Sequence, residues 1–198
     1  MQRRNPLAAH LLRWWAYFDN EDIWFELLQA DKEDGPAWIY ELNDELSFNA
    51  AMGTLHDYGL VDVHIGTTGL TESRGYSIHS CVHSWTIHIL NRNWDVHLAR
   101  LSIICVASLV PSENKPQFWQ LQRRLLSHAI KCHATIRSSD HDMPWAFHSL
   151  ANLYSDQGKM DKAEAMYQRA LEGKEKAWGP DHTQGSDTLH ISTHRPSV

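Results

Sequence analysis

Histidine is the residue type in this chain that could most readily bind a metal ion or take part in catalysis. The chain has 198 residues, and fourteen of them are histidines. His79 and His83 stand four positions apart, a spacing that can place two imidazoles of one helix on a metal ion. His128, Cys132 and His133 form a second group. The first pair has no intervening glutamate and no evident third ligand. We therefore interpret both groups as packed or exposed side chains, and we predict no metal site.

Catalytic patterns are equally absent. The sequence has no Gly-x-Ser-x-Gly elbow and no nucleophile paired with an obvious base. One acidic run stands out, and its members are Glu21, Asp22, Glu26, Asp31, Glu33 and Asp34. We interpret this run as a solvated helix face and loop rather than as a cation site. The sequence predicts no catalytic residues and no enzyme.

Composition and charge narrow the class of protein. Hydrophobic residues make up 42% of the chain and charged residues 21%, which is typical of a globular protein. The net charge of -6 gives no general attraction to nucleic acid or to an anionic membrane. Three widely spaced cysteines without a C-x-x-C pair indicate a reducing compartment. The longest apolar stretch, 101–110, is about half of a bilayer span, so we expect a cytoplasmic protein without a membrane partner.

Hydrophobic periodicity and turn residues predict the elements that position these side chains. Helices are predicted at 7–18, 22–30, 44–57, 80–90, 94–110, 116–138, 144–157 and 160–178. Two strands rich in β-branched residues are predicted at 60–65 and 75–78, joined by a polar Gly/Thr-rich connection. Gly59 is expected to end the helix at 44–57. Helices followed by a two-stranded wing and another helix make an α+β unit of winged-helix type.

The strongest motif lies in the segment AFHSLANLYSDQGKMDKAEAMYQRALEGKEKAWGPDHT, which begins at residue 146. Its signature positions are Phe147, Leu150, Ala151, Tyr154, Gly158, Ala163, Tyr167 and Ala170. Small Ala151 and Ala163 would let two antiparallel helices approach closely. Gly158 can adopt the positive φ that a tight turn between helices needs.

This segment resembles a tetratricopeptide repeat, in the longer variant of kinesin light chains and fungal NLR-like proteins. The alternative is an ordinary amphipathic helix hairpin. The resemblance implies protein binding on the concave face made by the first helix, with Asn152 and Tyr154 as candidates. A single repeat cannot bury both of its faces, so we expect an array that has been cut short.

The part of the chain before the repeat also resembles a known family. The segments LLRWWAYFDNEDIWFELL, LHDYGLVDV and GYSIHSCVHSWTIHIL resemble the winged-helix subdomain that follows the nucleotide-binding domain in fungal NB-ARC–TPR proteins. FWQLQRRLLSHAIKC resembles the bridging helix before their repeats. The order and spacing of these segments carry the resemblance over most of 7–183. It implies a non-catalytic regulatory fragment of a nucleotide-switched STAND/NLR-type signalling protein.

In that family, a histidine after the wing approaches the β-phosphate of bound ADP. The matching tripeptide here is Ile78-His79-Ser80, where Ser80 replaces an acidic residue. An imidazole at a helix N-terminus can donate a hydrogen bond to a phosphate oxygen. The Gly-Lys pairs at 158–159 and 173–174 do not fit a phosphate-binding loop. The chain itself is therefore expected to hold no cofactor. ADP or ATP would bind only with a nucleotide-binding domain from a longer parent, which this chain would contact intramolecularly.

The sequence as a whole predicts a mostly α chain in four parts. These are a winged-helix-like unit at 7–92, a helical bridge at 93–140, one tetratricopeptide repeat at 144–183 and a disordered tail at 184–198. A stand-alone adaptor with no nucleotide dependence is the alternative function. DNA binding is the other rival, but the helix at 44–57 has no Lys or Arg and the wing has only Arg74, so no nucleic-acid partner is expected.

Overall fold

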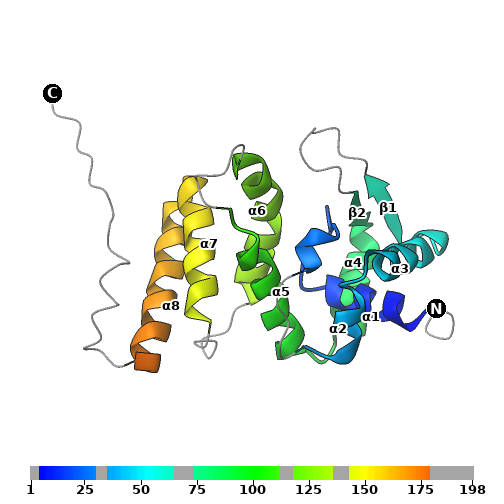
Figure 1. Ribbon diagram of the computed structural model, residues 1–198, viewed down its shortest axis with the longest axis horizontal. Helices are drawn as coiled ribbons and strands as arrows, with labels where there is room; N and C mark the ends of the chain where they lie inside the picture. The colour runs from blue at the N-terminus through cyan, green and yellow to red at the C-terminus, as the bar shows by residue number, and fades with distance from the viewer. Residues whose placement is uncertain (1–4, 30–34, 65–73, 112–117, 136–142, 179–198) are drawn as a thin grey trace. The chain divides into compact units, whose positions relative to one another are not determined.

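The structure is a computed structural model that describes residues 5–29, 35–64, 74–111, 118–135 and 143–178. The described chain is mostly helical with one small two-stranded sheet, as the sequence predicts (Figure 1). It divides into two compact units, residues 1–136 and 137–198. The predicted disordered tail at 184–198 lies outside the described residues.

Most elements belong to the first unit. They are α1 (Pro6–Trp15), the 3-10 turn η1 (Glu26–Leu28), α2 (Ala37–Glu41), α3 (Glu45–Asp57), β1 (Val61–His64), β2 (Gly75–Ile78), α4 (Ser80–Trp85), the π-helical turn η2 (Thr86–Leu90), α5 (Val96–Ser108) and α6 (Phe118–Thr135). The second unit holds α7 (Pro144–Asp156) and α8 (Met160–Trp178).

Local capping explains where several helices begin and end. The side chains of Asn5, Asp44 and Asp95 accept hydrogen bonds from the first-turn amides of α1, α3 and α5. Such N-caps satisfy amide groups that have no partner within the helix. Gly59 follows α3 with a φ of 65°, the left-handed conformation that glycine adopts without steric cost. The predicted end of this helix at Gly59 is confirmed.

The sheet is a short antiparallel hairpin whose register runs from Val61 opposite Ile78 to His64 opposite Gly75. Ile23 adds an isolated bridge to Tyr76 on the other edge of β2, and its amide donates to the Tyr76 carbonyl at 2.8 Å. Both bridge side chains are buried. The hairpin is therefore tied to the segment that follows α1.

The predicted helix at 22–30 is wrong. Ile23 pairs with β2, and Asp22 has a φ of 57°, which an α-helix cannot accommodate. Only the 3-10 turn η1 remains, with Leu27 and Leu28 buried. The closely spaced apolar residues imitate a helix, but long-range pairing with β2 decides the conformation. The short helix α2 was not predicted.

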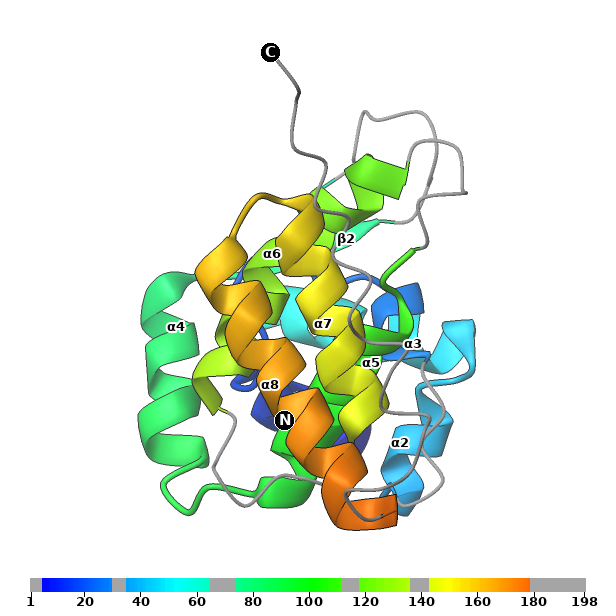
Figure 2. The ribbon, with the colours of Figure 1, turned by 90° about the vertical axis from the view of Figure 1, so that its left-hand side faces the viewer.

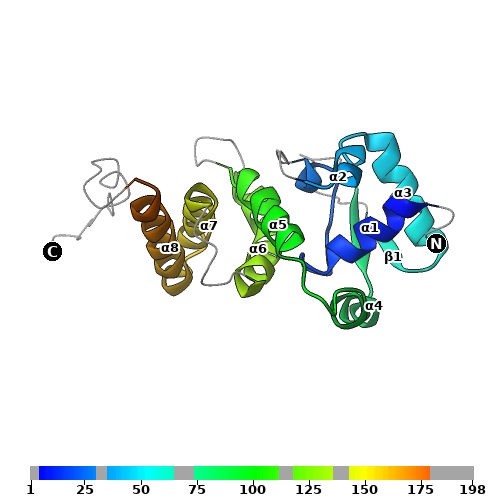
Figure 3. The same ribbon diagram turned by 90° about the horizontal axis from the view of Figure 1, so that it is seen from below.

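Aromatic and leucine side chains of α1 make much of the core of the first unit. Leu11, Leu12, Trp14 and Trp15 are all buried. The indole of Trp14 donates to the Leu98 carbonyl at 3.1 Å and ties α1 to α5. Figure 3 shows α1 beside α3, and α5 beside α6. Each large apolar side chain buried in this way contributes about 1.5–3 kcal/mol. None of the described helices is long and apolar enough to cross a membrane.

Candidate protein-binding site

The second unit is built on close contact between α7 and α8, which lie side by side (Figures 1 and 2). The face of α8 toward the unit's interior carries small or flexible residues, and Ala163, Met166 and Ala170 are buried there. Between the helices, Gly158 has a φ of 69° and its amide donates to the Ser155 carbonyl at 2.9 Å. Small side chains permit the close approach, and the glycine permits the turn.

The structure brings the eight predicted repeat positions together in this unit. Six are buried, namely Phe147, Leu150, Ala151, Tyr154, Ala163 and Ala170. Tyr167 is half-buried, and Gly158 lies in the exposed turn. Of the two residues proposed to meet a partner, Tyr154 is fully buried and Asn152 is half-buried. Tyr154 is therefore a core residue, and only Asn152 is left as a contact candidate.

One side of α7 presents side chains suited to recognising another chain, and we call it the α7 face. It consists of Trp145, His148 and Asn152, with Tyr167 of α8 beside them. Trp145 is 48% exposed. The hydroxyl of Tyr167 donates to Asn152 Oδ1 at 2.7 Å, and its ring meets His148 edge-on with centroids 5.5 Å apart. These contacts hold the Asn152 amide and the rings of His148 and Tyr167 in place.

The two titratable rings of the α7 face, His148 and Tyr167, have pKa values shifted toward their uncharged forms. Burial, with a smaller contribution from Lys174, lowers the pKa of His148 below its ordinary value of 6.5. Burial also raises the pKa of Tyr167, with Asp156 contributing in the same direction. Both rings are thus uncharged near pH 7. An exposed tryptophan, a hydrogen-bonded amide and neutral rings are the kinds of groups that contact peptide groups and apolar side chains in protein interfaces.

His79 stands directly after β2 as the N-cap of α4, where its exposed ring accepts a hydrogen bond at Nδ1 from the Cys81 amide at 3.3 Å. With Nδ1 accepting, a neutral ring carries its proton on Nε2 and can donate it to a ligand. His79 and the repeat positions belong to different units.

Several of the side chains considered as metal ligands instead contact other groups of the protein. His83 is buried, with Nε2 at 3.4 Å from the Trp15 carbonyl. His128 is held between the amide of Asp19 and the carbonyl of Asp22. Cys132 is buried beside Ser102, and burial raises its pKa to about 12. Among the described residues no three ligand groups gather where they could hold a metal ion.

A polar cluster that the sequence did not indicate joins the loop at 19–24 to α6. The guanidinium of Arg124 donates to both carboxylate oxygens of Asp22, from Nε at 2.5 Å and from Nη2 at 2.7 Å. The same guanidinium lies over the Trp24 ring, 3.9 Å from its centroid. Asp22 and Arg124 are 102 positions apart. The acidic run was interpreted as solvated, and for Asp22 this interpretation is wrong.

Glycine at position 75 is required by this cluster. A Cβ added there would collide with Oδ1 of Asp22, whereas a Cβ added at Gly53 in α3 would meet nothing within 4 Å. We expect Gly75→Ala to destabilise the first unit by about 1–3 kcal/mol, because the ion pair must move. Gly53→Ala should instead stabilise it by about 0.5–1 kcal/mol, since alanine is favoured inside a helix. Urea unfolding of both variants measures the difference, and equal effects would contradict this role of Gly75.

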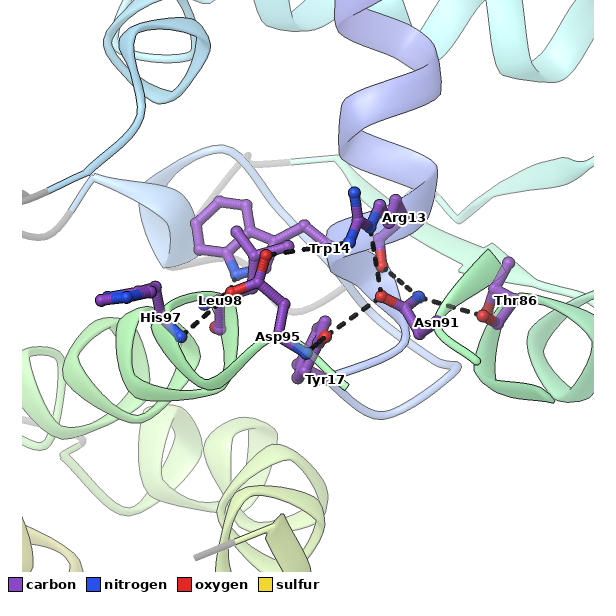
Figure 4. Close-up of polar contacts among 8 residues, drawn as sticks. All are labelled: Arg13, Trp14, Tyr17, Thr86, Asn91, Asp95, His97 and Leu98. Atoms are coloured by element: carbon purple, nitrogen blue, oxygen red, sulfur yellow. Dashed lines mark hydrogen bonds and ion pairs between the residues drawn. The ribbon is translucent and has the colours of Figure 1, made fainter. Parts of the chain in front are cut away.

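A second polar network centres on Asn91, which is 3% exposed (Figure 4). Its amide nitrogen donates to the carbonyls of Arg13 at 2.9 Å and Thr86 at 3.0 Å. Its oxygen accepts from the Tyr17 hydroxyl at 3.0 Å, and that hydroxyl in turn accepts from the Asp95 amide at 2.9 Å. One asparagine, directly after η2, therefore joins α1, the first residue of η2 and the start of α5. No local pattern in the sequence could have revealed it, because its partners Arg13 and Tyr17 lie more than seventy positions away.

Comparison with known proteins bears on the second unit. Searches among curated proteins and among solved structures give no significant match to the chain. A family model does match residues 145–184, which include α7 from its second residue onward, all of α8 and the α7 face. That family is the tetratricopeptide repeat, whose members typically serve as protein-interaction modules, and six of the eight predicted repeat positions are buried in the unit that it matches.

Proposed function

We propose that the second unit binds a protein partner through the α7 face. The observation that carries the proposal is the exposed Trp145 on the first helix of a matched tetratricopeptide repeat, beside the Asn152 amide that Tyr167 holds in place. Binding to a partner would bury this indole, and tryptophan is enriched among residues that dominate interface energetics. The role is non-catalytic, because the surface offers recognition rather than reactive groups.

Replacing Trp145 with alanine tests this proposal. Loss of a central tryptophan costs about 2 kcal/mol of binding energy, which is roughly a thirtyfold weaker Kd. We expect that loss for a partner isolated with the wild-type chain and measured by calorimetry. Glu172→Ala is the matched control, because Glu172 is exposed on the outer side of α8, and its Kd should stay within about twofold. Equal Kd values for wild type and Trp145→Ala would overturn the proposal.

We further propose that the whole chain is a cytoplasmic regulatory fragment of a nucleotide-switched, STAND/NLR-type fungal protein. On this proposal the winged-helix-like unit is 7–92, the bridge is 93–140 and the repeat is 144–183. Support comes from the order of elements, with helices, a hairpin and a helix capped by His79. The Nε2 proton of His79 would donate to a phosphate of ADP held by a domain outside this chain. Contacts made only with ADP would favour one state of the switch.

Sequencing the transcript through both ends of the reading frame tests this wider proposal. A phosphate-binding loop upstream and further repeats downstream would support it and make His79→Ala worth measuring for ADP retention. Stop codons at the present ends would contradict it and favour the stand-alone adaptor. Binding through the α7 face does not depend on this outcome.

A further inference from the structure

His128 occupies an unusual place for an ionisable side chain. It lies on α6 and is completely buried between Phe18 and Trp24, whose ring centroids are 6.0 and 5.9 Å from its own. Both of its nitrogens contact the backbone of the loop at 19–24. The Asp19 amide donates to Nδ1 at 3.2 Å, and Nε2 lies 3.1 Å from the Asp22 carbonyl. One ring therefore connects α6 to this loop at two points.

These two contacts determine where the proton must be. A backbone amide can only donate, so Nδ1 must carry a lone pair, and a backbone carbonyl can only accept, so Nε2 must carry the proton. Only the neutral ring with its proton on Nε2 satisfies both contacts. A second proton would point Nδ1–H at the Asp19 N–H and break that hydrogen bond. The loop would then lose one of its two direct contacts with the ring.

The charged groups around the ring are Asp19 and Asp22 from the loop and Arg124 from α6. Burial is the largest influence and lowers the pKa of His128 from 6.5, with Arg124 acting in the same direction and both aspartates opposing. The closed form is thus fully stable above pH 6.5 and loses stability as the pH falls below that value. Arg124 also contacts the loop, through its ion pair with Asp22 and its position over the Trp24 ring. The Asp22 side chain is 37% exposed, so solvent screening weakens the ion pair.

We propose that His128 is a proton-sensitive latch, whose protonation releases the loop at 19–24 from α6 while the rest of the first unit stays folded. The loop also carries the bridge from Ile23 to β2, so release frees the segment that ties the hairpin to α1. The helices α5 and α6 also pack against each other, with Cys132 beside Ser102, and this contact holds α6 in the unit. This inference is independent of the proposed protein binding.

Hydrogen exchange of the full chain at pH 7.5 and pH 5.0, corrected for intrinsic exchange rates, tests the latch. If the open ring titrates at 6.5 and the closed ring stays neutral, opening becomes about thirtyfold more favourable between these two values. We expect protection of the amides of Asp19 and Ile23 to fall by that factor. Protection in α3 should change far less. Uniform loss of protection across the first unit would indicate global acid unfolding and overturn the proposal.

His128→Gln removes the titration but keeps one acceptor and one donor, so the pH response of the loop should disappear. His133→Gln, five positions away on the same helix and only half-buried, should retain it. An undiminished response in His128→Gln would overturn the latch. If that variant does not fold, the His128 ring can be titrated by NMR in the wild-type chain. Its protonation should coincide with loss of Asp19 amide protection, and protonation with the amide still protected would contradict the proposal.

Discussion

Replacing Asn91 with alanine is expected to destabilise the first unit by about 3–5 kcal/mol, because each buried polar group left unpaired costs about 1–3 kcal/mol. The substitution removes the acceptor of the Tyr17 hydroxyl and the donor that serves the carbonyls of Arg13 and Thr86. It also disconnects α1 from the turn that precedes α5. Urea unfolding followed by circular dichroism measures the loss, provided that the m-value is unchanged.

Asn93→Ala is the matched control, since Asn93 has the same side chain two positions away and is exposed. Its effect should stay within about 0.5 kcal/mol. Tyr17→Phe should cost less than Asn91→Ala, because it breaks only the hydroxyl contacts. Equal stabilities for Asn91→Ala and Asn93→Ala would show that the network around Asn91 does not hold these elements together.

Phe147→Ala is expected to have an effect of similar size in the second unit. Phe147 is completely buried in α7, and truncating a buried phenylalanine costs about 3–5 kcal/mol through lost contacts and the cavity left behind. The second unit contains only two described helices, so it has little other core to compensate. Hydrogen exchange of peptides from 144–178 reports this loss separately from the first unit.

Trp145→Ala provides the comparison in the same helix, because Trp145 is a larger residue but is 48% exposed. We expect it to reduce protection in α7 and α8 far less than Phe147→Ala does. The two variants therefore separate the roles of neighbouring aromatic residues, one in the core and one on the surface. If Trp145→Ala unfolded the helix pair as completely as Phe147→Ala, the α7 face would be part of the core and unsuited to binding.

The sequence was sufficient to predict those parts of the fold that depend on contacts between nearby residues. Gly59 and Gly158 could be predicted because a positive φ at the end of a helix favours glycine whatever lies elsewhere. The α7–α8 pair could be predicted because its signature positions recur at helical spacing within about forty residues. In both cases the side chains and their partners are close in the sequence.

The polar contacts between residues far apart in the chain could not be predicted from the sequence. Asp22 was interpreted as a residue of a solvated helix, yet its partner Arg124 lies on α6 and its conformation is set by that contact and by β2. Asn91 follows a run of apolar residues and carries no motif, and its importance arises from α1 and α5 meeting around it. Periodicity reports burial along one element and cannot report which distant polar group that element will meet.

The most direct test of binding through the α7 face is a hydrogen-exchange footprint of the full chain with and without its isolated partner. We expect slower exchange concentrated in 145–155, with α8 peptides around Glu172 and the α4 segment around His79 nearly unchanged. With the partner at a concentration near the wild-type Kd, the same footprint should nearly disappear with Trp145→Ala, because binding is about thirtyfold weaker. Protection centred on α4 or on the hairpin of the first unit, with α7 unaffected, would contradict the proposed role of this helix pair.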